Sequence, residues 1–487
     1  MADMKTAGYG SWKSPVTSEL VSSGAIRFSG EIEIDDGVLY WVEMRPSEAG
    51  RYVIVCRSPD GQVFDITPAP YNVRTRVHEY GGGAFIVDNG VIYFSNFDDQ
   101  RLYCQKPGSS PEPLTPQGDV RYADGDVDHR RSRIICVCED HTDNDKEPVN
   151  SLAGVCTQGK EPVQKLVSGN DFYSSPRISP DGSHLAWLIW NHPNMPWDYT
   201  ELWVGEIKED GAIRNPVLVA GGTKESICQP RYSPDGTLYF ISERTGWWNL
   251  YRWRDGQVEP LCEMEAEFGS PHWVFGLSDY AFESAERLIC TYVQNGISYM
   301  ASLDTETLKF EILDVPYTSI SSLKATSGCA VLLAGSVNET SAVVRLDLVT
   351  GESEILRRST DIIVEHDYLS VPEAIEFSTE NGLIAHALYY RPKNGEFIAP
   401  ESELPPLIVI SHGGPTSATS GVLSLSIQYW TSRGFAVADV NYGGSTGYGR
   451  EYRQRLDGQW GIVDVDDCVN CARYLTERGE VDSERVT

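Results

Sequence analysis

The sequence has no run of consecutive apolar residues long enough to cross a membrane, for which about 18 are needed. Its N-terminus, Met1-Ala2-Asp3-Met4-Lys5, also lacks the apolar segment that a secretory signal requires. We therefore expect a soluble, cytoplasmic protein that has no membrane partner.

Positive charge is scarce as well. The chain has 40 Lys and Arg against 70 Asp and Glu, which gives a formal net charge of −30. A surface this acidic repels the phosphate backbone of DNA and RNA. We therefore expect no nucleic-acid partner.

Paired cysteines are missing too. The eleven cysteines are odd in number and scattered, which argues for reduced thiols and against a disulfide framework. Cys468 and Cys471 form the only C-x-x-C pair, and no second pair or nearby histidine completes a zinc site. We interpret both as packing residues of a helix and expect neither a metal nor a cofactor.

Short apolar strands separated by turns are what the chain has in abundance. From about residue 30 to 355, strands rich in Val, Ile, Tyr and Trp alternate with Asp-Gly, Asn-Gly and Pro-Asp-Gly turns. Comparable strands begin near residues 38, 91, 134, 185, 238, 288 and 330. This spacing of roughly forty to fifty residues is typical of four-stranded propeller blades. It predicts a β-propeller with seven blades; a pair of unrelated β-sandwiches is the alternative.

The pattern changes after about residue 360. A hairpin across Glu380-Asn381-Gly382 is followed by strands that alternate with helical segments, as in a parallel α/β sheet. We therefore divide the chain into a β-propeller with a short N-terminal extension, residues 1–360, and a second domain, residues 361–487.

In this second domain the apolar strand Leu407–Ile410 runs directly into His412-Gly413-Gly414. Two adjacent glycines let backbone N–H groups approach a ligand closely, because no Cβ intervenes. In α/β-hydrolases a glycine-rich loop of this kind donates one N–H to the oxyanion hole. A turn that only reverses the chain is the alternative.

A second strand, Phe435–Val440, leads into Asn441-Tyr442-Gly443-Gly444-Ser445-Thr446-Gly447-Tyr448-Gly449-Arg450, and then into Trp460-Gly461 and Asp464-Val465-Asp466-Asp467. This order closely resembles the prolyl oligopeptidase family of serine peptidases, in particular its acylaminoacyl-peptidase and dipeptidyl-aminopeptidase branches. The resemblance is specific over Pro406–Thr487 and looser upstream. It implies a β-propeller followed by the N-terminal part of an α/β-hydrolase domain.

Histidine is absent after His412, and this absence decides how Ser445 is interpreted. Gly443–Gly447 fits the G-x-S-x-G pattern of a nucleophile elbow, but α/β-hydrolases order their triad as Ser, then Asp or Glu, then His. In the resembled family the matching serine lies in a loop beside the site, and the nucleophile comes later. We expect the Ser-Asp-His triad to lie beyond Thr487, so that this chain alone is inactive. Ser445 as the nucleophile stays open, since triads occur in other chain orders.

Candidate site residues lie in both domains. Gly413 and Gly414 are the expected oxyanion-hole donors. Glu79, in the run Val77–Gly83, could pair with the amino terminus of a peptide, although a blade turn is the alternative for this run. The expected substrate-binding residues are Glu79, His78, His412 and Tyr442. Two aromatic stretches, Trp247-Trp248 and Asn191–Tyr199, could cover an entrance or pack at strand edges.

We therefore expect a serine peptidase that acts on short peptides near their N-terminus. A non-catalytic propeller scaffold, or truncated isoform, and a small-molecule esterase are the alternatives. The expected partner is an oligopeptide substrate. A complementing C-terminal hydrolase fragment and a homo-oligomer stay open as partners.

Overall fold

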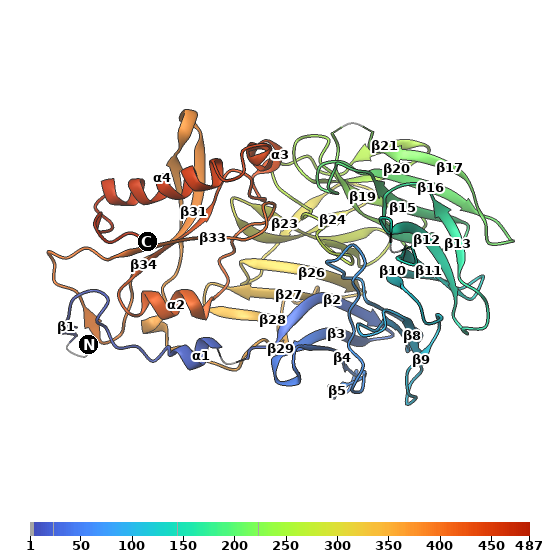
Figure 1. The fold of residues 1–487 in the computed structure, drawn as a ribbon, viewed down its shortest axis with the longest axis horizontal. Coiled ribbons are helices and arrows are strands. Elements are labelled where there is room, and N and C mark those ends of the chain that lie inside the picture. The colour runs from blue at the N-terminus through green and yellow to red at the C-terminus, as the bar shows by residue number, and fades with distance from the viewer. Residues whose placement is uncertain (1–3, 23, 144, 223) are drawn as a thin grey trace.

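The computed structural model describes residues 4–22, 24–143, 145–222 and 224–487. Seven four-stranded sheets form a β-propeller, and the last quarter of the chain forms an α/β-hydrolase sheet beside it (Figure 1). Each propeller sheet uses four consecutive antiparallel strands. The prediction of a seven-bladed propeller followed by a hydrolase part is therefore confirmed.

The strands of the first four blades are β2 (Arg27–Asp35), β3 (Val38–Arg45), β4 (Arg51–Arg57), β5 (Val63–Asp65); β6 (Phe85–Asp88), β7 (Val91–Ser95), β8 (Leu102–Gln105), β9 (Glu112–Pro113); β10 (Val120–Asp128), β11 (Arg133–Asp140), β12 (Val149–Cys156), β13 (Gln164–Ser168); and β14 (Phe172–Ile178), β15 (His184–Trp190), β16 (Glu201–Ile207), β17 (Ile213–Ala220). Those of the last three blades are β18 (Ile227–Tyr232), β19 (Leu238–Ser242), β20 (Asn249–Arg254), β21 (Gln257–Pro260); β22 (Tyr280–Phe282), β23 (Arg287–Gln294), β24 (Ile297–Asp304), β25 (Phe310–Leu313); and β26 (Ser319–Thr326), β27 (Cys329–Ser336), β28 (Glu339–Asp347), β29 (Ser353–Arg358).

The strands that recur in the sequence occupy one position in every blade. They correspond to β3, β7, β11, β15, β19, β23 and β27, which are the second strands of the seven sheets. A second strand is paired along both edges, and its faces pack against the adjacent blades, so its residues are mostly buried. This burial explains why their apolar runs dominate the sequence pattern.

Apolar clusters join each blade to the next. The cluster between the fourth and fifth blades, for example, contains Leu188, Val204 and Phe240. The ring closes in the same way, because Ile32 and Trp41 of the first blade pack against Val331 of the last. Strand pairing stays within each blade, so closure rests on this apolar packing together with ion pairs such as Lys324–Glu33 and Arg357–Glu43.

Five first strands carry a bulge at the centre of the ring, where the register shifts. In each of these a residue with positive φ lies within the shift; it is Gly30 in β2, and Asp124, Ser175, Gln229 or Ser322 in the other four strands. Bulges redirect the next side chain. Two positions further on, each of the four strands places a charged residue that lines a cavity of about 280 Å³ in the ring; these residues are Asp126, Arg177, Arg231 and Lys324.

The hydrolase part is a four-stranded sheet of order β30-β31-β34-β33. Its strands are β30 (Glu373–Ser378), β31 (Ile384–Tyr390), β33 (Leu407–Ser411) and β34 (Ala436–Asn441), and only β33 and β34 pair in parallel. Its helices are α2 (Leu425–Thr431), α3 (Gly449–Arg453) and α4 (Val463–Glu477). Short 3₁₀ turns lie at Pro46–Glu48, His366–Tyr368, Glu380–Gly382 and Gln454–Leu456.

The outer side of β33 begins to pair with the last residues of the chain. Leu407 and Val486 form a parallel bridge, and the N–H of Val409 donates to the carbonyl of Thr487 at 2.8 Å. The segment around Val486 therefore lies along the outer edge of β33 as a neighbouring strand would.

The N-terminal segment lies against the hydrolase part. Strand β1 (Lys5–Thr6) pairs in parallel with β32 (Phe397–Ile398), and helix α1 (Ser18–Ser22) follows. The chain then enters the ring at Ile26, whose N–H donates at 2.9 Å to the carbonyl of Ser359, where the chain leaves it.

A buried charged cluster joins the propeller to helix α3. The carboxylate of Glu243, on a propeller loop, pairs with the guanidinium groups of Arg450 and Arg453. Arg453 also lies over the ring of Trp248 at 4.3 Å and donates to the carbonyl of Trp197. The two aromatic stretches expected at an entrance or at strand edges thus pack at this junction. No helix in the described part of the chain is long and apolar enough to span a bilayer.

Candidate active site

The turn after β33 offers two unused backbone donors. The N–H groups of Gly413 and Gly414 donate to no group among the described residues, and both glycines are exposed. Gly414 has φ of +65°, a left-handed conformation in which a side chain would be strained. Free N–H groups held on a rigid turn suit the binding of a developing negative charge.

Three side chains hold this turn from behind. Nε2 of His412 lies 2.6 Å from Oγ of Ser445, and Nδ1 lies 3.3 Å from the hydroxyl of Tyr442. The rings of His412 and Tyr442 stack with centroids 4.5 Å apart. Burial raises the pKa of Tyr442 to about 12, so its hydroxyl stays protonated and can donate to the carbonyl of Gly414 at 3.4 Å. The Tyr442 hydroxyl therefore contacts the turn itself.

The His412–Ser445 pair resembles a catalytic dyad, but its surroundings argue against that role. Ser445 is fully buried, so a carbonyl carbon has no access to its hydroxyl. The ring nitrogen of His412 that faces away from Ser445 meets a phenol, whereas a triad places a carboxylate there. Burial also lowers the pKa of His412, partly offset by the backbone of Gly413 and Gly414. A neutral imidazole that links β33 to the 443–447 loop fits this geometry.

A propeller residue forms the other wall of the turn. Nε1 of Trp273 donates to the carbonyl of Thr416 at 2.7 Å. A Cβ added at Gly414 would lie 3.7 Å from the Trp273 ring, so the indole packs directly on the glycine turn. The site is therefore enclosed by both parts of the molecule.

The run Val77–Gly83 adopts an unusual backbone. His78, Glu79 and the three following glycines all have positive φ. A Cβ at Gly82 would lie 2.5 Å from the carbonyl oxygen of Phe275, so only glycine fits there. Strained backbone of this kind is concentrated at functional sites.

His78 and Glu79 are adjacent in the sequence but lie in different surroundings. His78 is buried among the rings of Phe172, Trp190 and Phe275, and burial lowers its pKa to about 4, so it is neutral at physiological pH. The carboxylate of Glu79 is largely exposed and pairs with Arg121 at 2.9 Å. Next to it, Tyr80 packs edge-on against Trp273, which brings this run beside the glycine turn.

Sequence reasoning missed Trp273, Thr416 and Arg121. The indole lies in a loop of the sixth blade and reaches the turn 143 residues later. No local pattern signals a contact between residues so far apart. The contact between Tyr80 and Trp273 was missed for the same reason, since no local pattern links the run Val77–Gly83 to Trp273.

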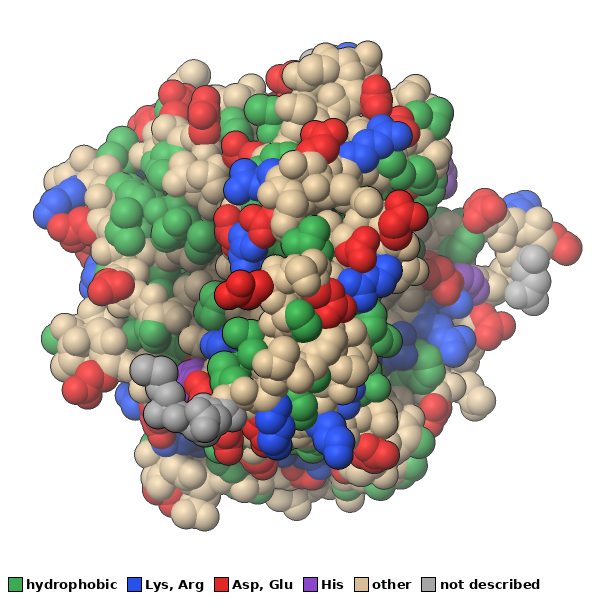
Figure 2. Space-filling model, turned by 90° about the vertical axis from the view of Figure 1, so that its left-hand side faces the viewer, with side chains coloured by type: hydrophobic (Ala, Val, Ile, Leu, Met, Phe, Trp, Pro, Cys, Tyr) green, Lys and Arg blue, Asp and Glu red, His purple; other side chains and the backbone are tan. Residues whose placement is uncertain are grey.

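Figure 2 views the molecule from the hydrolase end and shows acidic and basic side chains interspersed over that face. Helix α4 adds exposed apolar residues to the hydrolase surface, namely Val465 at 52% and Val469 at 43% exposure, and Ile462 just before it is 52% exposed. These residues leave the outer side of α4 partly apolar.

A seven-bladed propeller set over the glycine turn of an α/β-hydrolase sheet defines a propeller-capped hydrolase. Residues 422–487 match the model of the prolyl oligopeptidase family. A puromycin-hydrolyzing peptidase of Mycobacterium tuberculosis is 38% identical, with a TM-score of 0.93 over 99% of this chain and 76% of that one. A puromycin hydrolase mutant solved in complex with PGG gives the same values.

The acylamino-acid-releasing enzyme of Arabidopsis thaliana is 39% identical over 82 residues, which are 17% of this chain. That match spans 11% of the plant enzyme's length. The chain belongs to the prolyl oligopeptidase family, as its sequence motifs predicted.

Proposed function

We propose that this protein is part of a serine peptidase that releases residues from the N-terminal end of short peptides, as an acylaminoacyl- or dipeptidyl-peptidase does. The observation that carries the proposal is the pair of unused N–H groups at Gly413 and Gly414. They are fixed from behind by His412, Tyr442 and Ser445. The named activities of its relatives, and the PGG complex of one of them, support a peptide substrate.

In this proposal Gly413 and Gly414 bind the oxyanion that forms when a serine attacks the scissile carbonyl. Such preorganised donors stabilise the transition state more than the substrate. The glycine turn thus lowers the barrier to forming the acyl-enzyme, which water then hydrolyses.

The proposed nucleophile belongs to a Ser-Asp-His triad on hydrolase residues outside 1–487. Two features of the hydrolase part support further packing there. The outer edge of β33 carries Ile410 at 36% exposure, and α4 exposes Val465 and Val469. Apolar strand edges and helix faces of this kind are normally covered in a complete sheet.

The proposed substrate contacts are Glu79 and His78 on the propeller, with His412 and Tyr442 supporting the turn. The exposed carboxylate of Glu79 has the charge to bind a peptide amino group, and Arg121 fixes its position. A cytoplasmic location completes the proposal, and the eleven free cysteines support it.

A second candidate is hydrolysis by the His412–Ser445 pair within this chain, and their 2.6 Å contact favours it. The full burial of Ser445 weighs against it. The two candidates differ in which serine reacts, and a covalent reagent reports that directly.

The test is labelling with a fluorophosphonate probe, followed by mapping of the modified peptide. We expect the native protein, purified from its own cells, to be labelled on a peptide absent from residues 1–487. Residues 1–487 expressed alone should stay unlabelled. Modification of Ser445 would overturn the proposal and support the second candidate. A native protein that is neither labelled nor able to cleave peptides would indicate the scaffold alternative, and ester cleavage without peptide cleavage would indicate an esterase.

A matched pair of variants tests the glycine turn in the native protein that the probe identifies as active. Gly413→Pro removes one N–H, and kcat should fall by about 10²–10³. Gly413→Ala keeps the N–H, and its Cβ would meet nothing within 4 Å, so kcat should change little. Equal rates in both variants would remove Gly413 from the proposed oxyanion hole.

A further inference from the structure

The four charged residues that follow the central bulges do not all form ion pairs with described residues. Arg177 pairs with Asp124 at 2.8 Å, and Lys324 pairs with Glu33 at 2.8 Å. Arg231 occupies the equivalent position of the fifth blade, yet it forms no ion pair with any described residue. Its single hydrogen bond is a long one of 3.5 Å from Nη2 to the carbonyl of Leu277.

The side chain of Arg231 is half-buried, and its guanidinium lies 5.8 Å from the centroid of the Tyr280 ring. Its Nε is buried and donates to no described group. Burial lowers the pKa of Arg231, whereas at Arg177 burial is outweighed by Asp124 and Asp126 and the pKa is raised. A partly desolvated cation without an ion pair is unfavourable, and a ligand that brings a negative charge would offset that cost.

The acidic groups around the cavity leave little negative charge for Arg231. Asp124 and Glu33 are already paired. Burial raises the pKa of Glu31 to about 7, and burial also raises the pKa of Asp126. Burial likewise raises the pKa of Asp279, and the charge of Arg231 partly offsets that rise. The site therefore combines one guanidinium that has no ion pair among the described residues with carboxylates that are already paired or whose charged form burial disfavours.

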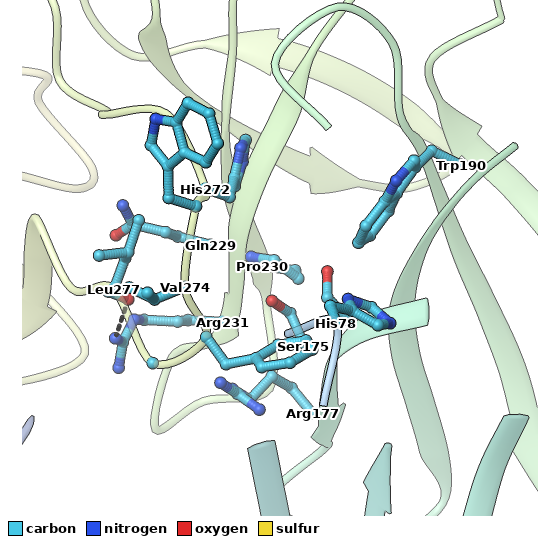
Figure 3. A pocket seen from close by; sticks show the side chains of 14 residues that line it. His78, Ser175, Arg177, Trp190, Gln229, Pro230, Arg231, His272, Val274 and Leu277 are labelled. Atoms are coloured by element: carbon cyan, nitrogen blue, oxygen red, sulfur yellow. Dashed lines mark hydrogen bonds between the residues drawn. The ribbon is translucent and has the colours of Figure 1, made fainter. Parts of the chain in front are cut away.

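Arg231 lines the same pocket as the residue that packs on the glycine turn. Trp273, His78 and Trp190 line this pocket together with Arg231 and Arg177. Figure 3 shows Arg231 on the side of Leu277, with His78 and Trp190 on the opposite side. Trp273 lines this pocket and also packs on the turn at Gly414, so its indole lies between the two sites.

We propose that Arg231 binds the C-terminal carboxylate of the short peptide whose scissile bond lies at Gly413 and Gly414. The inference rests on the proposed function and adds a substrate class, namely oligopeptides with a free C-terminus. Guanidinium groups bind carboxylates through two parallel N–H donors, and Arg231 has its Nε free for such a contact.

This contact would also select for length. An extended chain advances about 3.3 Å per residue, so each residue added after the scissile bond moves the C-terminal carboxylate further from the glycine turn. Longer peptides and folded chains could not place their C-terminus at Arg231. The propeller would therefore select substrates by their C-terminal carboxylate as well as by their width.

The test is calorimetric binding of Pro-Gly-Gly and of its C-terminal amide to the 487-residue chain. The two probes differ in the terminal charge alone. We expect the acid to bind roughly 10- to 100-fold more tightly than the amide, as expected for a buried charge-assisted contact. Equal affinity for the two probes, or no binding of the acid, would overturn the proposal without any variant.

Variants then locate the contact. Arg231→Gln should abolish the preference and leave both peptides at the affinity of the amide, while Arg231→Lys should keep part of it. The control Arg254→Gln alters an exposed pair with Glu306 and should leave the preference intact. A preference that survives in a folded Arg231→Gln protein would assign the carboxylate to another cation.

These experiments test the carboxylate site and the peptidase activity independently, so either proposal can be refuted without the other. If the fluorophosphonate experiment overturns the peptidase while the acid preference depends on Arg231, the carboxylate site stands without the catalytic role. If the peptidase is confirmed and the acid and amide bind equally, the carboxylate site alone is lost.

Discussion

The molecule is joined together in two different ways. Neighbouring blades meet through apolar clusters that repeat around the ring, such as Val204 and Phe240 between the fourth and fifth blades. The propeller and the hydrolase part also meet through apolar contacts such as that of Trp273 with Gly414, but their junction adds a charged cluster of Glu243, Arg450 and Arg453.

The two kinds of interface differ in how well they tolerate amino-acid substitutions. An apolar interface loses stability in proportion to the surface removed, and it repacks around small changes. A buried ion cluster depends on each member, because removing one partner leaves the other charges uncompensated. The ring should therefore yield gradually to substitution, whereas the junction should fail sharply.

The largest expected effect is at the junction. Glu243→Gln leaves Arg450 and Arg453 buried beside a neutral amide and should destabilise the protein by about 3–5 kcal/mol. The shift of the urea midpoint measures this loss. The control Glu306→Gln removes an exposed partner of Arg254 and should cost less than about 1 kcal/mol. Similar shifts in the two variants would contradict the contrast between junction and surface.

The next effect compares the closing interface of the ring with an internal one. Ile32 packs where the last blade meets the first, and Ile227 packs between the fourth and fifth blades. Each Ile→Ala change should cost about 2–5 kcal/mol, because both remove a buried side chain from similar packing. Equal urea midpoints would confirm that closure is as strong as any other interface. A clearly smaller loss at Ile32 would show a weaker closing interface.

The smallest expected effect depends on pH and concerns the hydrolase sheet. Burial raises the pKa of Asp439 from 3.8 to about 6 in the folded protein. Between these values the folded state binds more protons than the unfolded state, so this group's contribution to stability is lost as pH rises. Asp439→Asn should therefore gain stability relative to the parent from about pH 4 to 6, by at most about 3 kcal/mol.

Urea midpoints at pH 4 and pH 7 measure that difference. The variant Asp98→Asn, at an exposed loop position, serves as the control and should follow the parent at both values. A gain for Asp439→Asn that is the same at both pH values would contradict the expected titration.

Much of the fold follows from the sequence because it depends on local patterns. The hairpin across Glu380-Asn381-Gly382 was predicted from its turn residues, and strands β30 and β31 pair around it. A helix that contains Cys468 and Cys471 was predicted, and both residues lie in α4. Helix α2 was missed, because Leu425–Thr431 has no acidic residue in its first turn and no side-chain cap.

The candidate site was predicted only in part. The glycine turn could be found because a strand precedes it, and the family motif surrounds it. Contacts across the chain could not, since Glu243 and Arg450 are 207 residues apart and no periodicity links them. The absence of an ion pair at Arg231 among the described residues is likewise a property of the folded ring, because Arg177 stands in a similar local sequence and is paired. The boundary between the two domains at residue 360 stays a prediction.

The adjacent entry and exit of the ring, at Ile26 and Ser359, have a consequence for engineering. The whole propeller is an insertion whose two connections pass through one point, so another module with neighbouring termini could be grafted there. Such a chimera would keep the hydrolase sheet and change only what is allowed to reach it.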